Sequence, residues 1–492
     1  MNLSKTKYTN ACVCKKMLWL DTYKSEVKGA IDLNSVMDNG NLVHDVARDI
    51  LGDHITIEFN NDLKVMVDDT KKAMKQENVV ICEASFIYKN NFCSVDILEK
   101  NKDSYNIYEV KGSTKEKDIF LTDISFQYYV LKNLGINVQK YYLVHLNSSY
   151  YRHGELELDK LFTKIDVTDE IKKLENVVAN NIESINKAME SKEEPDIDIG
   201  IKCFNPYNCP YFTYCTSSLE KPNVFSINRL QTKKKLEYYK NKLITFKDLK
   251  DVEMNPKFKM QIEYELDNKE DYINYDNIKS FLDTLTYPLY YLDFETFQLP
   301  VPAFDNINPY MKIPFQYSLH YKEGENGELL HKEFLGTTPD PRRELALQLI
   351  SDIPRDVCVL AYNMGFEKSV IKNLAFIFPD LREHLMNIHD NIKDLMVPFA
   401  NKDYYNKAMQ GSYSIKYVLP ALFPNDESLD YHNLELVHNG SEAMSFYNTL
   451  FDKTKEEQEY IRDRLLKYCY LDTYAMVKVH DKLIEVVEKK NG

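Results

Sequence analysis

The segment at residues 92–113 constrains the fold most strongly, because two β-type runs flank the polar turn Asn101–Ser104. This arrangement predicts a hairpin. If the turn is centred midway along those four residues, Asp96 and Glu109 lie directly opposite each other on neighbouring strands, about 4.5 to 5.5 Å apart. Lys111 shares the face of Glu109, because strand side chains alternate. The sequence therefore predicts two facing carboxylates with an ammonium beside them.

Facing carboxylates of this kind repel each other unless a cation lies between them. An adjacent ammonium can orient or activate a metal-bound water, so the hairpin indicates hydrolytic chemistry. The alternative is an exposed hairpin whose Asp, Glu and Lys side chains share no function.

A second group of acids begins with Asp293 and Glu295, which end the apolar run PLYYLDFETF and point to one face of a strand. Downstream, VCVLAYNMGFEKSVIKNL predicts a buried strand that enters a helix, with Glu367 at the junction. In the helical run near the C-terminus, Tyr468 and Asp472 lie four apart on one face. Two divalent ions about 3.5 to 4 Å apart require acids from separated segments in this way. Taken alone, Asp293 and Glu295 also fit a salt-bridged strand end.

Nine cysteines are an odd number in a chain with no export signal, which argues against a disulfide framework. Five of them lie at the two edges of the first 215 residues: Cys12, Cys14, Cys203, Cys209 and Cys215. Four thiolates suit an iron–sulfur cluster or tetrahedral zinc, since both favour soft ligands. The residues alone leave cluster, zinc and unligated buried cysteines open, and either metal would tie two distant segments together.

The length of 492 residues predicts two to three domains. We expect a first α/β domain at residues 1–218, a helical connector at 219–285 and a second α/β domain at 286–492. In the second domain the hydrophobic pattern predicts a long helix at about 455–488 and strands at 288–297, 313–321 and 356–362.

The formal net charge of -14 argues against a generic basic nucleic-acid coat, because phosphate contacts need local Lys and Arg. It does not exclude a nuclease, since clustered metal-binding carboxylates add negative charge that divalent cations offset. The N-terminal sequence lacks the apolar core of a signal peptide, and no run approaches the roughly 18 apolar residues of a membrane span. We therefore expect a soluble, cytoplasmic protein with no membrane partner.

Asp96, followed by the run Glu109-Val110-Lys111, resembles the pattern of PD-(D/E)XK nucleases. The surrounding sequence resembles their RecB-like branch, which includes the iron–sulfur nucleases of CRISPR adaptation and of AddB. This resemblance covers about residues 1–218 and implies a restriction-endonuclease-like fold for the first domain.

In that branch an upstream histidine in a helix is a further metal ligand, and His44 in LVHDVARDIL matches it. A glutamine in the helix after the lysine strand supports the site, and Gln127 in DISFQYYVL matches that position. The tyrosine that often follows four residues later is Leu131 here, which weakens that part of the motif. The resemblance thus implies three metal ligands and a lysine that aids the nucleophile: His44, Asp96, Glu109 and Lys111.

The same branch places one cysteine before the nuclease fold and three after it, and together they hold a [4Fe-4S] cluster. The resemblance implies Cys203, Cys209 and Cys215 as the three. Cys14 is the better fourth ligand, because CKKMLWL matches the cysteine-basic-aromatic start of the family. Cys12 is spare or an alternative ligand, and zinc is the alternative metal.

The second group of acids resembles the DEDDy subgroup of DnaQ-like 3'-5' exonucleases, which have the RNase H fold. Asp293 and Glu295 match the first motif, Glu367 the second and Asp472 the third. Tyr468 stands where a tyrosine orients the attacking water in that family. The second motif usually has Asp, so Glu367 departs from it by one methylene, which could alter the metal spacing.

Residues 285–490 as a whole resemble a domain of unknown function that is commonly fused behind RecB-like nucleases. The resemblances together predict an iron–sulfur RecB-like nuclease fused to a DnaQ-like exonuclease. Both sites would hydrolyse phosphodiester bonds of DNA, or of RNA, with Mg or Mn. The rival prediction is a nucleic-acid-binding scaffold in which one or both nuclease centres are inactive, and Leu131 and Glu367 are the irregularities that support it.

Overall fold

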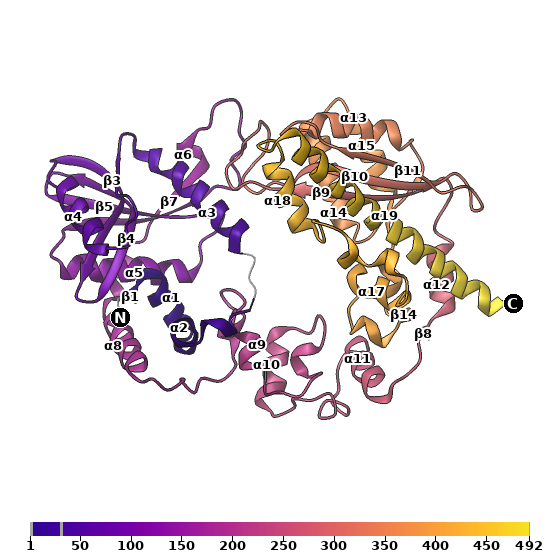
Figure 1. Ribbon diagram of the computed structural model, residues 1–492, viewed down its shortest axis with the longest axis horizontal. Helices are drawn as coiled ribbons and strands as arrows, with labels where there is room; N and C mark the ends of the chain where they lie inside the picture. The colour runs from indigo at the N-terminus through magenta and orange to yellow at the C-terminus, as the bar shows by residue number, and fades with distance from the viewer. Residues whose placement is uncertain (1–2, 30–32, 492) are drawn as a thin grey trace. The chain divides into compact units, whose positions relative to one another are not determined.

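The computed structural model describes residues 3–29 and 33–491, and its chain divides into two units, each with mixed α/β structure (Figure 1). The first unit runs to Ser218 and also includes the segment Leu299–Met311. The second unit holds Leu219–Gln298 and the chain from Lys312 onward. The segment expected as a helical connector, residues 219–285, therefore counts with the second unit.

The first unit is built on a mixed sheet with the strand order β2-β3-β4-β5-β6-β7, and the short β1 pairs in parallel with β4. Strand β4 is antiparallel to both of its neighbours, β3 and β5, whereas β6 runs parallel to β5. The strand bounds are β1 Leu3–Ser4, β2 Ile55–Thr56, β3 Asn78–Tyr88, β4 Asn91–Asn101, β5 Ser104–Lys111, β6 Val138–Leu146 and β7 Phe162–Asp166.

The predicted hairpin is formed by β4 and β5. Asn101 pairs with Ser104, and the first of the two residues between them, Lys102, has a φ of 53°. A positive φ at this position is typical of the two-residue turns that match the twist of a hairpin. The pairing continues to Ile97 opposite Tyr108. The predicted turn and register are therefore confirmed.

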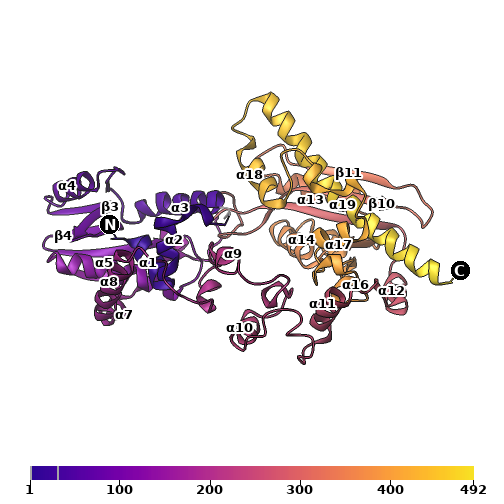
Figure 2. The same ribbon diagram turned by 60° about the horizontal axis from the view of Figure 1, so that its bottom comes forward.

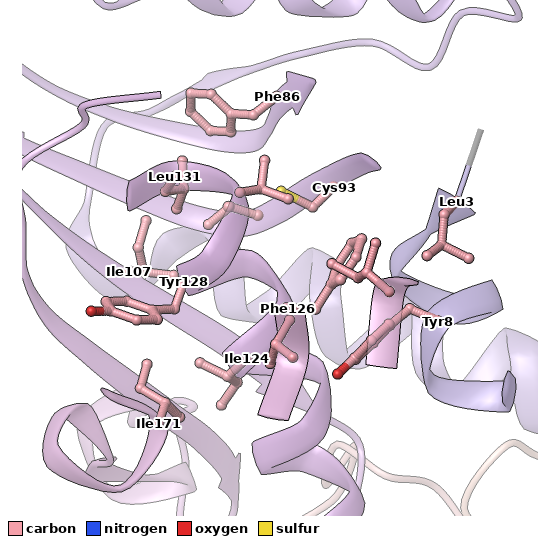
Figure 3. Packing of buried hydrophobic residues seen from close by; sticks show 14 of the residues in the cluster. Leu3, Tyr8, Phe86, Cys93, Ile107, Ile124, Phe126, Tyr128, Leu131 and Ile171 are labelled. Carbon is pink, nitrogen blue, oxygen red and sulfur yellow. The ribbon is translucent and has the colours of Figure 1, made fainter. Parts of the chain in front are cut away.

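Helices cover this sheet, and the largest share of the apolar core comes from α5, where Phe126 and Leu131 are fully buried. The ring of Tyr8 in α1 stacks on Phe126 with 4.6 Å between ring centroids (Figure 3). Leu131 thus packs in the core, at the position where RecB-like nucleases often have tyrosine. The helix bounds are α1 Lys5–Val13, α2 Lys15–Tyr23, α3 Leu33–Ala47, α4 Leu63–Ala73, α5 Asp118–Asn133, α6 Leu158–Leu161, α7 Thr168–Lys173, α8 Glu175–Glu190 and α9 Phe212–Cys215.

The second unit has its own mixed sheet with the order β11-β10-β9-β12-β13, and a separate small ladder joins β14 to β8. Strand β9 is central, antiparallel to β10 and parallel to β12. Its near-continuous apolar run suits a strand buried on both faces. The bounds are β8 Tyr272–Ile273, β9 Leu289–Phe297, β10 Ile313–Lys322, β11 Leu330–Leu335, β12 Cys358–Ala361, β13 Ile392–Asp394 and β14 Tyr404–Tyr405, which confirms the strands predicted at 288–297, 313–321 and 356–362.

Helix α19 is the long C-terminal helix of this unit and packs against β9 and β10 (Figure 2). It contains the helix predicted at about 455–488. Among the described residues, no helix combines the length and the apolarity needed to cross a bilayer. The helix bounds are α10 Thr232–Lys240, α11 Pro256–Asp267, α12 Tyr275–Leu282, α13 Arg342–Asp352, α14 Gly365–Ile377, α15 Arg382–Asn391, α16 Val397–Ala400, α17 Ile415–Leu422, α18 Gly440–Leu450 and α19 Lys455–Asn491.

Candidate metal centres

The first centre lies where the hairpin ladder ends. The last paired residues of β4 and β5 are Ile97 and Tyr108, so the next residue on each strand is an acid, Asp96 or Glu109. Asp96 Oδ2 accepts a hydrogen bond of 2.7 Å from the backbone N–H of Val110. Both acids are buried. Asp and Glu side chains are almost never fully buried unless they are paired with another group.

Glu109 is surrounded by nitrogen donors. Its Oε1 accepts hydrogen bonds from Lys111 Nζ at 2.6 Å and from Lys5 Nζ at 2.8 Å. Its Oε2 accepts one from Gln127 Nε2 at 2.7 Å. Burial alone would raise the pKa of Glu109, but the ammonium groups of Lys111 and Lys5 hold that pKa well below its ordinary value. Glu109 is therefore a charged carboxylate within a buried ion-pair network.

Two members of this network were missed by the sequence analysis. Asp123 of α5 accepts a hydrogen bond from Lys111 Nζ at 2.5 Å, and burial, followed by the charge of Glu109, raises its pKa. It lies four residues before Gln127, so helical spacing could have identified it. Lys5 comes from the other end of the unit's sequence and lies 3.5 Å from Asp96 Oδ1. No spacing rule links it to the hairpin.

Asp96 also belongs to a second group, in which ligand atoms of His44, Glu83 and Asp96 lie within 4.8 Å of one another. His44 Nδ1 is 3.9 Å from Asp96 Oδ1. Glu83 was not predicted. It interrupts the pairing of β3 with β4 between Cys82 and Ala84, and its φ is 59°. Burial, followed by the charge of Asp96, raises the pKa of Glu83. A residue in this left-handed region costs energy, and such residues cluster at functional sites.

The predicted four cysteines line one small cavity of about 20 Å³. Cys14 is the C-cap of α1, Cys203 ends a short 3-10 helix, and Cys215 ends α9. Burial, followed by the charges of the neighbouring cysteines, raises the pKa of Cys209 to about 11. Cys12 lies elsewhere, with its sulfur accepting a hydrogen bond from Asn181. The geometry therefore selects Cys14 over Cys12 as the fourth member of the group.

The second centre brings three of the four acids predicted for it to within ligand distance of one another, and the fourth, Glu367, acts on two of them through its charge. Asp293 and Glu295 come from β9, Glu367 from the first turn of α14, and Asp472 from α19. Ligand atoms of Asp293, Glu295 and Asp472 lie within 4.8 Å of one another. Burial is the main reason that the pKa values of Asp293 and Glu295 rise well above their ordinary values, and the charge of Asp472 is the next. Burial also raises the pKa of Asp472 to about 6 and that of Glu367 to about 8.

These four carboxylates lack the direct counter-charges of the first centre. Among the described residues, no lysine, arginine or histidine forms an ion pair of 4.0 Å or less with them. Lys416 lowers the pKa of Glu295 and of Asp472 only through its more distant charge. Glu367 is 2% exposed, and its Oε2 is buried without a hydrogen-bond partner. A group of acids this buried and this unpaired is expected to hold a cation.

Two tyrosines act on Asp472. The Tyr431 hydroxyl donates a 2.7 Å hydrogen bond to Asp472 Oδ1. Tyr468, which the sequence predicted, lies one helical turn before Asp472, and its hydroxyl together with that of Tyr431 lowers the Asp472 pKa against the effect of burial. Tyr431 was missed because it lies in a short 3-10 helix far from α19 in sequence, and the chain has 36 tyrosines.

A cavity of about 820 Å³ adjoins this centre in the second unit. Tyr431 lines it together with Lys416, and Phe423 adds apolar surface. The helix α18 begins beside the acids, and a Cβ on Gly440 would lie 3.2 Å from Glu295 Oε2. Glycine therefore allows the start of this helix to approach the carboxylate. The cavity thus has a basic group and aromatic surface, and Tyr431 joins its wall to Asp472 of the second centre.

The profile of a domain of unknown function, DUF2779, matches residues 290–414. This match lies inside the range 285–490 for which the sequence resembled a domain of unknown function, and it confirms a domain of that kind over the matched residues. An uncharacterized protein of Ureaplasma parvum serovar 3 is 27% identical over 226 residues, which are 41% of this chain and 32% of the relative. The chain thus spans about a third of the length of the curated relative it matches.

Proposed function

We propose that this protein is a metal-dependent nuclease that hydrolyses phosphodiester bonds at two sites, one in each unit. The observation that carries the proposal is the second centre, where ligand atoms of Asp293, Glu295 and Asp472 converge from two elements and the charge of Glu367 acts on the first two from a third. Among the described residues, none of these acids has an ion-paired base. Oxygen ligands of this kind suit Mg or Mn. The RNase H-like exonuclease assignment is supported by a mixed sheet whose central strand carries two of the acids.

In the second centre the four acids would hold the divalent ions. When bound, two such ions supply a stronger nucleophile at neutral pH and stabilise the charge that develops on phosphorus. Tyr431 keeps Asp472 oriented through its hydrogen bond, and Tyr468 is close enough to Asp472 to orient an attacking water. In the adjoining cavity the ammonium of Lys416 suits a phosphate, and the ring of Phe423 suits a base. A 3'-5' exonuclease acting on a nucleic-acid end fits these roles.

In the first centre His44 and Asp96 would hold a divalent ion, with Glu109 or Glu83 completing the set. Lys111 lies between Glu109 and Asp123, where its ammonium can orient a nucleophilic water or a phosphate oxygen. Gln127 fixes the orientation of Glu109 through its amide. These roles agree with a RecB-like PD-(D/E)XK nuclease.

The four cysteines fit a [4Fe-4S] cluster better than zinc. A tetrahedral zinc site with bonds of about 2.3 Å brings its sulfurs within about 3.8 Å of each other. Among the described residues, no three of these cysteine sulfur atoms all lie within 4.8 Å of one another. The wider spacing supports a larger inorganic group held by Cys14, Cys203, Cys209 and Cys215, and the cavity of about 20 Å³ between them would widen to admit it. Its role would be structural, because it ties residues near both ends of the first unit.

The proposal is tested by incubating the anaerobically purified protein with Mn²⁺ and end-labelled DNA or RNA. Asp293→Ala should abolish release of nucleotides from 3' ends and spare the other activity, whereas Lys111→Ala should do the reverse. Glu58→Gln, at an exposed acid of the first unit, is the matched control. If the parent protein cleaves nothing, or if neither substitution changes cleavage, the proposal is wrong.

A nucleic-acid-binding role without cleavage is the second candidate for the first unit. One observation favours it: both oxygens of Glu109 are already engaged by nitrogen donors from Lys5, Lys111 and Gln127. In that case the Asp293→Ala protein would retard labelled DNA in a gel while leaving it intact in Mn²⁺. Cleavage by that variant would instead assign catalysis to the first unit.

A further inference from the structure

Helix α1 has its two ends at two different centres of the first unit. It begins at Lys5, whose ammonium lies 2.8 Å from Glu109 Oε1 and 3.5 Å from Asp96 Oδ1. Its C-cap is Cys14, which lines the four-cysteine cavity. Nine helical residues span about 14 Å. One short, continuous helix therefore joins the cysteine group to the acid group.

The packing of α1 allows little independent movement of its ends. Tyr8 and Ala11 are buried at 1% and 3% exposure, and the Tyr8 ring stacks on Phe126 (Figure 3). Phe126 directly precedes Gln127, which holds Glu109. At the far end the N–H of Cys14 donates to Asn10 O at 2.9 Å. Because packed interiors are close to incompressible, a displacement at Cys14 is transmitted along the helix to Lys5.

The position of Lys5 matters because its ammonium competes for the oxygens that a divalent ion needs. Lys5 and Lys111 both donate to the same oxygen of Glu109. Lys5 also contacts Oδ1 of Asp96, the oxygen that is 3.9 Å from His44 Nδ1. A positive charge this close to two ligand oxygens opposes the entry of a second cation. Moving or removing Lys5 should therefore strengthen metal binding.

We propose that Lys5 is a positioning residue that limits divalent-metal binding at the first centre, and that α1 makes its position depend on the four-cysteine group. This inference rests on the proposed metal site of the first unit. It adds a regulatory link: when the cysteine group is ordered, α1 holds Lys5 against Glu109 and Asp96. When the group is lost, Lys5 releases these oxygens.

The first part is tested by calorimetric titration of Mn²⁺ into the full-length chain carrying Asp293→Ala, which removes an acid of the second centre. In this background Lys5→Met should bind Mn²⁺ more tightly by on the order of tenfold. Lys5→Arg keeps the charge and should leave the affinity unchanged. Lys7→Met removes the same charge from an exposed position on α1 and is the matched control. Unchanged or weaker Mn²⁺ binding by Lys5→Met overturns the inference.

The link to the cysteines is tested by a double-mutant cycle with Cys203→Ala, because coupled residues give non-additive effects. Cys203→Ala should strengthen Mn²⁺ binding severalfold when Lys5 is present and have no effect in the Lys5→Met background. Independent, additive effects would refute the link. Cys14→Ser, at the end of α1 itself, provides a second variant if Cys203→Ala does not fold.

The two levels of failure are distinguishable. If the parent protein cleaves DNA and binds Mn²⁺, but Lys5→Met binds it no more tightly, the inference fails and the proposed function stands. If the parent protein neither binds Mn²⁺ at the first centre nor cleaves DNA after Asp293→Ala, the proposed activity of that centre fails as well.

Discussion

The two acid groups differ in how their negative charge is balanced. In the first unit, Lys5 and Lys111 pair directly with Glu109, so the carboxylate has cations of the chain's own. In the second unit, Asp293 and Glu295 have no ion-paired base among the described residues, and their pKa values are raised by burial and by the other acids. In the first centre the chain's own ammonium groups neutralise Glu109. In the second centre, among the described residues, the acids have no ion-paired partner, so their charge is balanced only when a cation is supplied.

The largest expected effect of this difference is on stability without metal. Glu109→Gln removes the carboxylate charge that two largely buried ammonium groups share, leaving Lys111 with Asp123 and Lys5 with Asp96, and should lower the free energy of unfolding of the first unit by about 3 kcal/mol. Glu295→Gln, the same chemical change, relieves repulsion and should raise that of the second unit by about 1 kcal/mol.

Denaturant titrations in EDTA can separate the two units, because the chain has a single tryptophan and Trp19 lies in the first unit. Tryptophan fluorescence follows the first unit, whereas far-UV circular dichroism follows both. The contrast between the centres breaks down if Glu295→Gln destabilises the protein as much as Glu109→Gln does.

A second expected effect is on the pH dependence of stability in EDTA. The folded-state pKa values of Asp472, about 6, and Glu367, about 8, lie above their ordinary values, so the folded second unit binds more protons than the unfolded chain. This contribution to its stability is fully present below about pH 4 and is lost as the pH rises through 6 and 8. Glu109 of the first unit contributes in the opposite direction: its pKa is lowered, so its contribution to stability is present above its ordinary pKa and is lost as the pH falls through the lowered value.

Repeating the pH series with saturating Mn²⁺ provides the control. A bound cation should remove the loss of stability of the second unit between pH 5 and 8, because the ionised carboxylates then bind the cation and no longer repel one another. A second unit that loses stability equally with and without Mn²⁺ would show that its acids do not hold the metal.

A smaller effect concerns which acids of the first centre bind metal. Glu83 lies with His44 and Asp96, whereas Glu109 is held by nitrogen donors. Glu83→Gln should therefore weaken Mn²⁺ binding at the first centre by about tenfold, or about 1.4 kcal/mol. The titration uses the Asp293→Ala background, with Glu58→Gln as the exposed control. If Glu83→Gln binds Mn²⁺ as tightly as its parent does, Glu109 and not Glu83 is the third ligand.

The sequence predicted those parts of both centres that follow from local periodicity. The hairpin turn fixed Asp96 opposite Glu109, and the alternation along β9 put Asp293 and Glu295 on one face. Helical spacing likewise related Tyr468 to Asp472. These residues are close in sequence to a turn or to each other, so the local backbone geometry alone determines which of their side chains lie on the same face.

The residues that were missed depend on tertiary packing or on irregular backbone. Lys5 reaches the first centre because α1 packs on α5, and the sequence has no pattern that links these helices. Glu83 faces Asp96 only because β3 departs from regular pairing at that residue. Tyr431 arrives from a loop-like segment with a short 3-10 helix. Such positions are set by packing over long sequence separations, which propensity rules do not describe.

The smallest expected effect concerns the hydrogen bonds that tyrosine hydroxyls donate to Asp472. It tests whether the second centre depends on these uncharged donors, where the first centre has ammonium groups. Tyr431→Phe removes one hydrogen bond to Asp472, worth about 1 kcal/mol, and should lower nucleotide release by the second centre about fivefold. Tyr404→Phe removes a hydroxyl that donates to Asp271 elsewhere in the same unit and is the matched control. In the first centre Lys5 and Lys111 hold Glu109 by charge, so neither tyrosine substitution should change cleavage there. Equal losses in the two tyrosine variants would mean that Tyr431 acts only on folding, and that Asp472 is oriented by Tyr468 or by the metal alone.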